Sequence, residues 1–131
     1  MEESIFTKII KGTTPSYKIY EDDKTLAFLD IHPLQPGHTL VVPKKQIDHL
    51  WDLPDQDYQA LMSTCKKVAL HLRQQLNVAR VGVQVVGLDV SHAHVHLVPF
   101  DTINQFRASQ DLNSQVDHEQ LATIAAKLVI K

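Results

Sequence analysis

The feature that most constrains the fold is a run of alternating histidine and apolar residues close to the middle of the second half of the chain. Residues 92–97 read His-Ala-His-Val-His-Leu. Successive side chains of a β-strand point to opposite faces, so this period of two predicts a strand with its histidines on one face and its apolar residues towards the core. Neighbouring histidines would then be about 6.6 Å apart along the strand, and the outer two about 13 Å apart.

The rest of the chain predicts a small set of short elements around this strand. We expect a helix over 4–11, strands over 17–20, 25–30, 38–43, 80–87 and 92–99, one long helix over 54–77 and a last helix over 117–130. Residues 101–116 are polar and indicate irregular structure. Five short strands with mostly tight connections favour an α+β fold, in which a five-stranded antiparallel meander sheet carries its helices on one face.

Composition restricts the class of protein. The chain has 131 residues, of which 44% are hydrophobic and 21% charged, and we expect a single soluble domain over 1–131. A net charge of −2 argues against binding to a nucleic acid polymer, and the longest apolar runs are too short to span a membrane. Cys65 is the only cysteine, and the first residues lack the long apolar run of a signal peptide, so we expect a cytoplasmic location.

Three uses of the histidine row are open from the residues alone. Two histidines at positions i and i+2 could bind a metal ion together with ligands from elsewhere, but a third on the same strand could hardly join them. The row could also be ordinary polar surface. The third use is binding of an extended anion such as a phosphate, since each imidazole can donate a hydrogen bond to an oxygen. Crowding lowers imidazole pKa values and keeps one ring unprotonated, and that ring could act as a nucleophile.

The sequence HAHVHLVP resembles the signature of the histidine triad (HIT) family, in which three histidines alternate with apolar residues. The segments SIFTKIIKG, YKIYEDDKTLAFLDI and PGHTLVVPKK stand upstream of it in the family's order and spacing. The resemblance covers about residues 4–100, which would form the core of the domain, and leaves 101–131 as a C-terminal extension. It is closest to the Hint-like branch, and it implies a homodimeric nucleotide-binding hydrolase or transferase that needs no cofactor.

The resemblance also implies roles for four histidines. His94 would attack the α-phosphorus of a nucleotide conjugate and form a covalent nucleotidyl-histidine, from which water releases a nucleoside monophosphate. His96 would contact the phosphoryl oxygens. His92 would lie behind the nucleophile and hold it in position, and His38 would support the triad.

A second group of residues would bind the substrate, an AMP or GMP conjugate. The resemblance implies that the Asp30 carboxylate accepts hydrogen bonds from the ribose hydroxyls, with Ile31 at the pocket wall beside it. The apolar slot for the base would be formed by Ile5, Phe6, Ile9, Phe28 and Leu40. Ordinary core packing is the alternative for each apolar member of this group.

The chain departs from the family pattern directly before the triad, where it reads VQVVGLDVSHAH. Many relatives have a longer loop rich in Asn and Gly there, and Leu88 stands where they have Gln. Asp89 and Ser91 replace residues that often meet the phosphate or the leaving group. We hypothesise that Asp89 repels a polyphosphate leaving group and tolerates an amine better; the alternative is a simple turn residue.

Two further alternatives follow from these departures. A low-activity nucleotide-binding or regulatory protein would keep the pocket and lose turnover, and a dinucleoside polyphosphate hydrolase would use another leaving group. Some relatives bind zinc through cysteines near the N-terminus, where this chain has Ser4 and Thr7. We therefore expect no metal.

Overall fold

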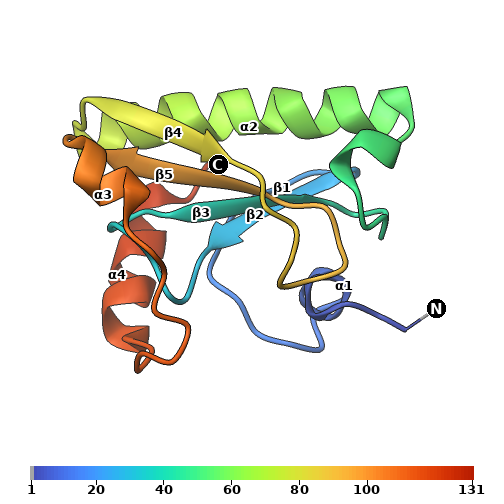
Figure 1. The fold of residues 1–131 in the computed structure, drawn as a ribbon, viewed down its shortest axis with the longest axis horizontal. Helices are drawn as coiled ribbons and strands as arrows, with labels where there is room; N and C mark the ends of the chain where they lie inside the picture. Colours follow the sequence, from blue (N-terminus) through green and yellow to red (C-terminus); the bar gives the residue numbers. More distant parts are fainter. Residues whose placement is uncertain (1) are drawn as a thin grey trace.

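A computed structural model describes residues 2–131 and contains one five-stranded antiparallel sheet (Figure 1). The strands are β1 (Lys18–Glu21), β2 (Thr25–Leu29), β3 (Thr39–Pro43), β4 (Arg80–Gln84) and β5 (Val95–Phe100). The predicted α+β class and the five antiparallel strands are confirmed. The strand order is β1-β2-β3-β5-β4, which departs from a simple meander because β5 lies between β3 and β4.

The long helix explains this order. Helix α2 (Asp55–Leu76) spans 22 residues, close to the predicted range, and leads the chain from β3 to β4 at the far edge of the sheet. The β4–β5 hairpin then turns back, and β5 pairs with β3. The remaining helices are α1 (Ile5–Ile10), α3 (Ile103–Arg107), α4 (His118–Leu128) and the 3-10 turn η1 (Leu50–Asp52). Helix α3 falls in the segment predicted to be irregular.

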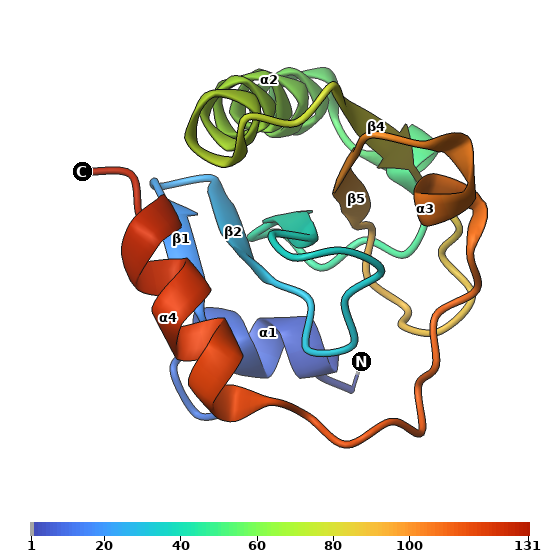
Figure 2. The same cartoon turned by 90° about the vertical axis from the view of Figure 1, so that its left-hand side faces the viewer.

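The helices cover both faces of the sheet, so the prediction that they pack on one face is wrong. Helix α2 covers one face, and α1 lies against the other (Figure 2). All five residues of β2 and all five of β3 are buried, so their alternating side chains need cover on both sides. From α1, Phe6 and Ile9 supply that second cover.

Alternation decides which apolar side chains meet which helix. On the α2 side, Ala27, Val41, Val95 and Leu97 belong to the main core, which also contains the buried apolar residues of α2 and α4. On the α1 side, the buried cluster consists of Phe6, Ile9, Leu26, Phe28, Leu40 and Val42. None of the helices within residues 2–131 is long and apolar enough to cross a membrane.

The histidine segment forms a strand only in part. Strand β5 begins at Val95, where its pairing with β3 begins, so of the three histidines only His96 belongs to it. The chain ahead of it is held instead by other backbone bonds, among them Ala93 N–H to the carbonyl of Ile47 at 2.7 Å. Strand β4 likewise ends at Gln84, earlier than predicted. The three histidines therefore do not form the evenly spaced row on one strand that the alternation predicts.

Candidate active site

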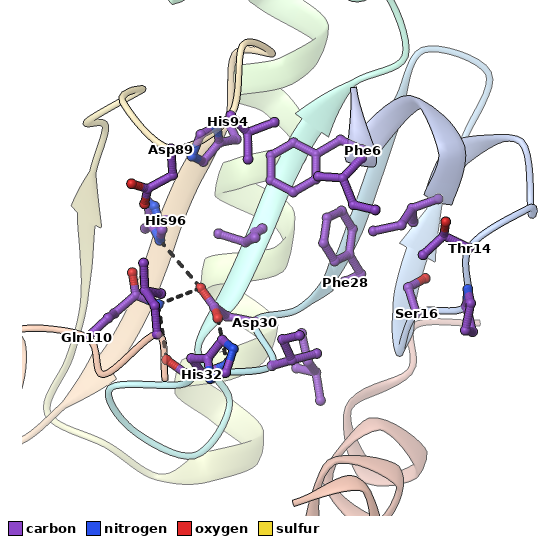
Figure 3. A pocket seen from close by; sticks show the side chains of 18 residues that line it. Phe6, Thr14, Ser16, Phe28, Asp30, His32, Asp89, His94, His96 and Gln110 are labelled. Atoms are coloured by element: carbon purple, nitrogen blue, oxygen red, sulfur yellow. Dashed lines mark hydrogen bonds and ion pairs between the residues drawn. The ribbon is translucent and has the colours of Figure 1, made fainter. Parts of the chain in front are cut away.

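A cavity of about 320 Å³ lies on the α1 side of the sheet (Figure 3). Its wall comes from α1, from the ends of β2 and β3, from the segment before β5 and from residues 110–112. Ten of the residues singled out from the sequence line it: Ile5, Phe6, Ile9, Phe28, Asp30, Ile31, Leu40, Asp89, His94 and His96. Such a volume is within the usual range for small-molecule sites.

The cavity has an apolar side and a polar side. Phe6 and Phe28 meet edge-on with ring centroids 5.5 Å apart, and the ring of Phe6 lies 5.0 Å from that of His94. His94 and His96 are neighbours, with ring centroids 5.2 Å apart. The cavity can therefore place an apolar ring system and an anionic group of one ligand side by side.

The tautomer of His94 follows from its backbone contact. Its Nδ1 lies 2.7 Å from the carbonyl oxygen of His92. A carbonyl oxygen can only accept, so Nδ1 carries the hydrogen and donates it. In the neutral ring the lone pair is then on Nε2. This is the state that a nucleophilic imidazole requires.

His92 does not line the cavity and is fully buried behind it. Its Nε2–H donates to the carbonyl oxygen of Pro43 at 2.8 Å, so its Nδ1 is the acceptor for the Ser4 hydroxyl at 2.7 Å. Burial is the main cause that lowers the pKa of His92, although the bond to Pro43 opposes it. A neutral His92 ring thus ties the start of α1 to the end of β3.

His38 and His96 form a hydrogen-bonded pair with a definite direction. The backbone N–H of Leu34 donates to His38 Nδ1 at 3.0 Å, so the hydrogen of the neutral ring is on Nε2. That Nε2–H donates to His96 Nδ1 at 2.9 Å, which leaves Nε2–H as the only donor of a neutral His96. Burial lowers the pKa of His38, and burial together with the nearby His38 and His94 lowers that of His96 to about 4. Both rings are therefore neutral at pH 7.

Asp30 follows β2 and is buried at the polar side of the cavity. Its Oδ1 accepts the backbone N–H of His32 at 2.8 Å, and its Oδ2 accepts the side-chain amide of Gln110 at 2.8 Å. Oδ2 also lies 3.6 Å from His38 Nε2 and 3.9 Å from His96 Nδ1. A buried carboxylate in this setting is satisfied by neutral donors rather than by an arginine or lysine.

Within residues 2–131, Asp30, His38 and His96 are the one group of three side chains close enough to share a metal ion. This set is not the pair of histidines at positions i and i+2 that the sequence suggested as metal ligands. Two of its three potential ligand atoms, His38 Nε2 and His96 Nδ1, are the donor and the acceptor of one hydrogen bond. In this arrangement His38 Nε2 carries a hydrogen, and that hydrogen is bonded to the lone pair of His96 Nδ1. Neither nitrogen therefore has a lone pair available to an ion.

Three predicted site residues lie outside the cavity wall. His38 and His92 are behind it, where they contact His96 and Ser4. Ser91 lines an adjoining cleft. The wall also contains residues that the sequence reasoning did not select for the site, namely Thr14, Pro15, Ser16, Leu29, His32, Val90, Gln110 and Leu112. For Gln110 and Leu112 no local signal exists, because only the path of the chain after α3 brings them there.

Comparison with known proteins points to one family. The model of the HIT domain family matches residues 11–103. An uncharacterised HIT-like protein of Borreliella burgdorferi is 40% identical over 106 residues, which cover 76% of each chain. The adenosine 5′-monophosphoramidase HNT1 of Saccharomyces cerevisiae is 38% identical over 96 residues, 72% of this chain and 61% of that protein.

Among solved structures, a Hit-like protein of Bartonella henselae involved in cell-cycle regulation superimposes with a TM-score of 0.84. It is 30% identical, and the match covers 96% of this chain and 93% of that one. The family match, the sequence relatives and the shared fold agree with the predicted resemblance. The chain belongs to the HIT family.

Proposed function

We propose that the protein is a nucleotide hydrolase or transferase that cleaves the bond between the α-phosphate of a purine nucleoside phosphoramidate and its amine. The observation that carries the proposal is the state of His94, whose Nδ1–H is held by a carbonyl oxygen while the ring lines a cavity with one apolar and one polar side. The 38% identity to a yeast adenosine 5′-monophosphoramidase supports the same activity.

The reaction has two steps. His94 Nε2 attacks the α-phosphorus and forms a P–N bond, while the bond to the leaving amine breaks and the amine departs with the electron pair and takes up a proton from solvent. Water then attacks the phosphorus and gives up a proton to solvent, the bond to Nε2 breaks with its electron pair returning to the ring, and the nucleoside monophosphate leaves. During the first step the ring becomes positively charged, and the carbonyl oxygen of His92 that accepts its Nδ1–H stabilises that charge. His96 donates its Nε2–H to the phosphoryl oxygens.

The rest of the nucleotide would follow the cavity from this point. The Asp30 carboxylate accepts hydrogen bonds from the ribose hydroxyls, and Ile31 lies beside them. The base lies in the apolar slot, where Phe6, Phe28 and Leu40 form the wall together with Ile5 and Ile9. His92 and His38 have no contact with the substrate and act as positioning residues for His94 and His96.

Charge in the adjoining cleft favours an amine as the leaving group. Glu2, Glu3, Asp48 and Asp89 line this cleft with Ser91, and Asp89 also lines the main cavity. Glu3 is paired with Lys11, but none of the described residues that line this cleft has a basic side chain. A departing polyphosphate would meet like charge there, whereas a protonated amine would be attracted.

The first experiment measures hydrolysis of adenosine 5′-phosphoramidate in the presence of a chelator, for the unaltered chain and for His94→Ala. We expect steady turnover by the unaltered chain and a loss of at least about a thousandfold in the variant, because the variant lacks the nitrogen that makes the covalent bond in the proposed mechanism. Binding of AMP to both, measured by calorimetry, is the control for folding. Tight AMP binding without turnover by the unaltered chain would indicate a nucleotide-binding regulatory protein instead.

A second experiment tests the leaving group. Asp89→Asn removes one negative charge where the main cavity meets the adjoining cleft. We expect the kcat/KM ratio of a dinucleoside polyphosphate to the phosphoramidate to rise by about threefold to tenfold, as for removal of one like-charge contact in a partly solvated site. Asp23→Asn, at an exposed aspartate that lines neither the main cavity nor the cleft, is the matched control. An unchanged ratio would contradict the role of Asp89 and leave it a turn residue.

We also propose that residues 1–131 form one domain and that the protein is cytoplasmic.

We further propose that two copies associate through the exposed edge of the sheet. Strand β4 is at the edge, and Val83, Val85, Val86 and Leu88 near it are exposed. An unpaired edge with exposed apolar side chains favours pairing with another strand. Light scattering of the unaltered chain and of Val83→Lys should show a dimer and a shift to monomer. An unaltered chain that is monomeric at the concentration used in the activity assays would contradict the proposed dimer.

A further inference from the structure

The segment between α3 and α4 lies outside residues 11–103, which match the family model, yet it reaches the candidate active site. Residues 108–117 connect the two helices and pass alongside the loop after β2 (Figure 2). Its Gln110 and Leu112 line the cavity, and Ser114 Oγ lies 3.1 Å from His32 Nδ1. We call residues 108–117 the strap.

The strap is anchored by a polar side chain. From residue 107 to residue 115, Gln110 is the one residue that is not exposed. Its amide nitrogen donates to Asp30 Oδ2 at 2.8 Å and to the carbonyl oxygen of His32 at 3.0 Å (Figure 3). A carboxylate and a carbonyl can only accept, so these two bonds determine which end of the amide faces Asp30. Hydrogen bonds to a charged acceptor are about twice as strong as those between neutral groups.

The contact matters because Asp30 has competing partners. Oδ1 is held by the His32 N–H, and Oδ2 by Gln110, so each oxygen keeps a lone pair for one further donor. Without Gln110, rotation of the carboxyl group would bring Oδ2 from 3.6 Å towards hydrogen-bond distance of His38 Nε2. His38 Nε2–H would then donate to Asp30 and no longer to His96.

We propose that Gln110 is a positioning residue that holds the Asp30 carboxylate with both oxygens available to the two hydroxyls of a ribose, and that it thereby makes the site selective for ribonucleotides over 2′-deoxyribonucleotides. The inference rests on the proposed binding of a nucleotide with its ribose at Asp30. It assigns a ligand-selecting role to the strap, through a side chain that is 80 positions away from Asp30 in the sequence.

The test compares the affinities for AMP and for 2′-deoxy-AMP by calorimetry. The unaltered chain should bind AMP about tenfold more tightly, the value of one hydrogen bond from a hydroxyl to a charged acceptor. Gln110→Met keeps the size of the side chain and removes its donors. We expect this variant to bind AMP about fivefold to tenfold more weakly, to bind 2′-deoxy-AMP within about twofold of the unaltered chain, and so to lose the discrimination. Gln115→Met, at an exposed position of the strap, should leave both affinities unchanged.

A double-mutant cycle with Asp30→Asn shows whether Gln110 acts through Asp30. In the Asp30→Asn background, Gln110→Met should have little further effect on AMP affinity. Equal weakening of both nucleotides by Gln110→Met, no weakening, or tighter AMP binding would each overturn the inference while the proposed function stands. An unaltered chain that binds neither nucleotide would overturn the proposed function itself.

Discussion

The two faces of the sheet are built from the same alternating strands but are covered differently. On one face, the 22-residue helix α2 packs over a continuous apolar core. On the other, α1 has only six residues and covers part of the sheet, and the candidate active site occupies the space beside it. Polar groups gather on this second face, where the buried side chains of Asp30, His38 and His96 contact one another. The comparison shows that incomplete cover, rather than a different strand pattern, makes room for a ligand.

The largest expected difference between the two faces is the loss of stability when a buried leucine is shortened. Leu72→Ala in α2 leaves a sealed void in the main core, whereas Leu40→Ala enlarges a cavity that is already open to solvent. We expect the free energy of unfolding to fall by about 4 kcal/mol for Leu72→Ala and by about 2 kcal/mol for Leu40→Ala, the difference being the cost of the void. Urea denaturation measures both. Equal losses would show that the two faces are packed alike.

Acid should destabilise the protein through the histidine face. Burial lowers the pKa of His96 from 6.5 to about 4. Between these values the unfolded chain binds a proton that the folded chain does not, so the free energy of unfolding falls as the pH is lowered from about 6.5 to about 4, by about 1–3 kcal/mol. Denaturation curves at several pH values should show a shallower fall for His96→Gln. An identical fall in that variant would assign the pH dependence to other groups.

The smallest expected effect concerns the junction between α1 and the histidine segment. Ser4 caps α1 by accepting the Thr7 N–H at 3.0 Å, and its hydroxyl donates to His92 Nδ1. Ser4→Ala removes both bonds and should lower the free energy of unfolding by about 1 kcal/mol. Thermal denaturation checks this against Ser109→Ala, a matched change at an exposed position. Equal stability of the two variants would mean that the cap contributes nothing measurable.

Much of the fold could be predicted because the period of apolar residues is a local property. The alternation in 25–29 and 39–43 separates the residues of the α1 side from those of the α2 side. The stripe over 54–77 predicted α2 to within about one residue at each end. The face covered by α1 was predicted incorrectly, because a short amphipathic helix can pack on either side and no local pattern records which side is vacant.

The candidate site was predictable where residues belong to one motif. Asp30, His94, His96 and the apolar slot were named from short segments, and the structure gathers them around one cavity. Gln110 was not, since a glutamine in a polar segment has no distinguishing neighbours. Its significance depends on Asp30, which lies in another part of the fold.

The sequence by itself therefore determined the five strands, the long helix and the family, because these depend on residue type and local spacing. Only the tertiary structure decided the protonation pattern of the histidines. His94 and His92 take their tautomers from the carbonyl oxygens of His92 and Pro43, and His38 takes its own from the N–H of Leu34. The chemistry of an imidazole depends on which nitrogen carries the hydrogen, and that is set by whichever donor or acceptor the folded chain places against it.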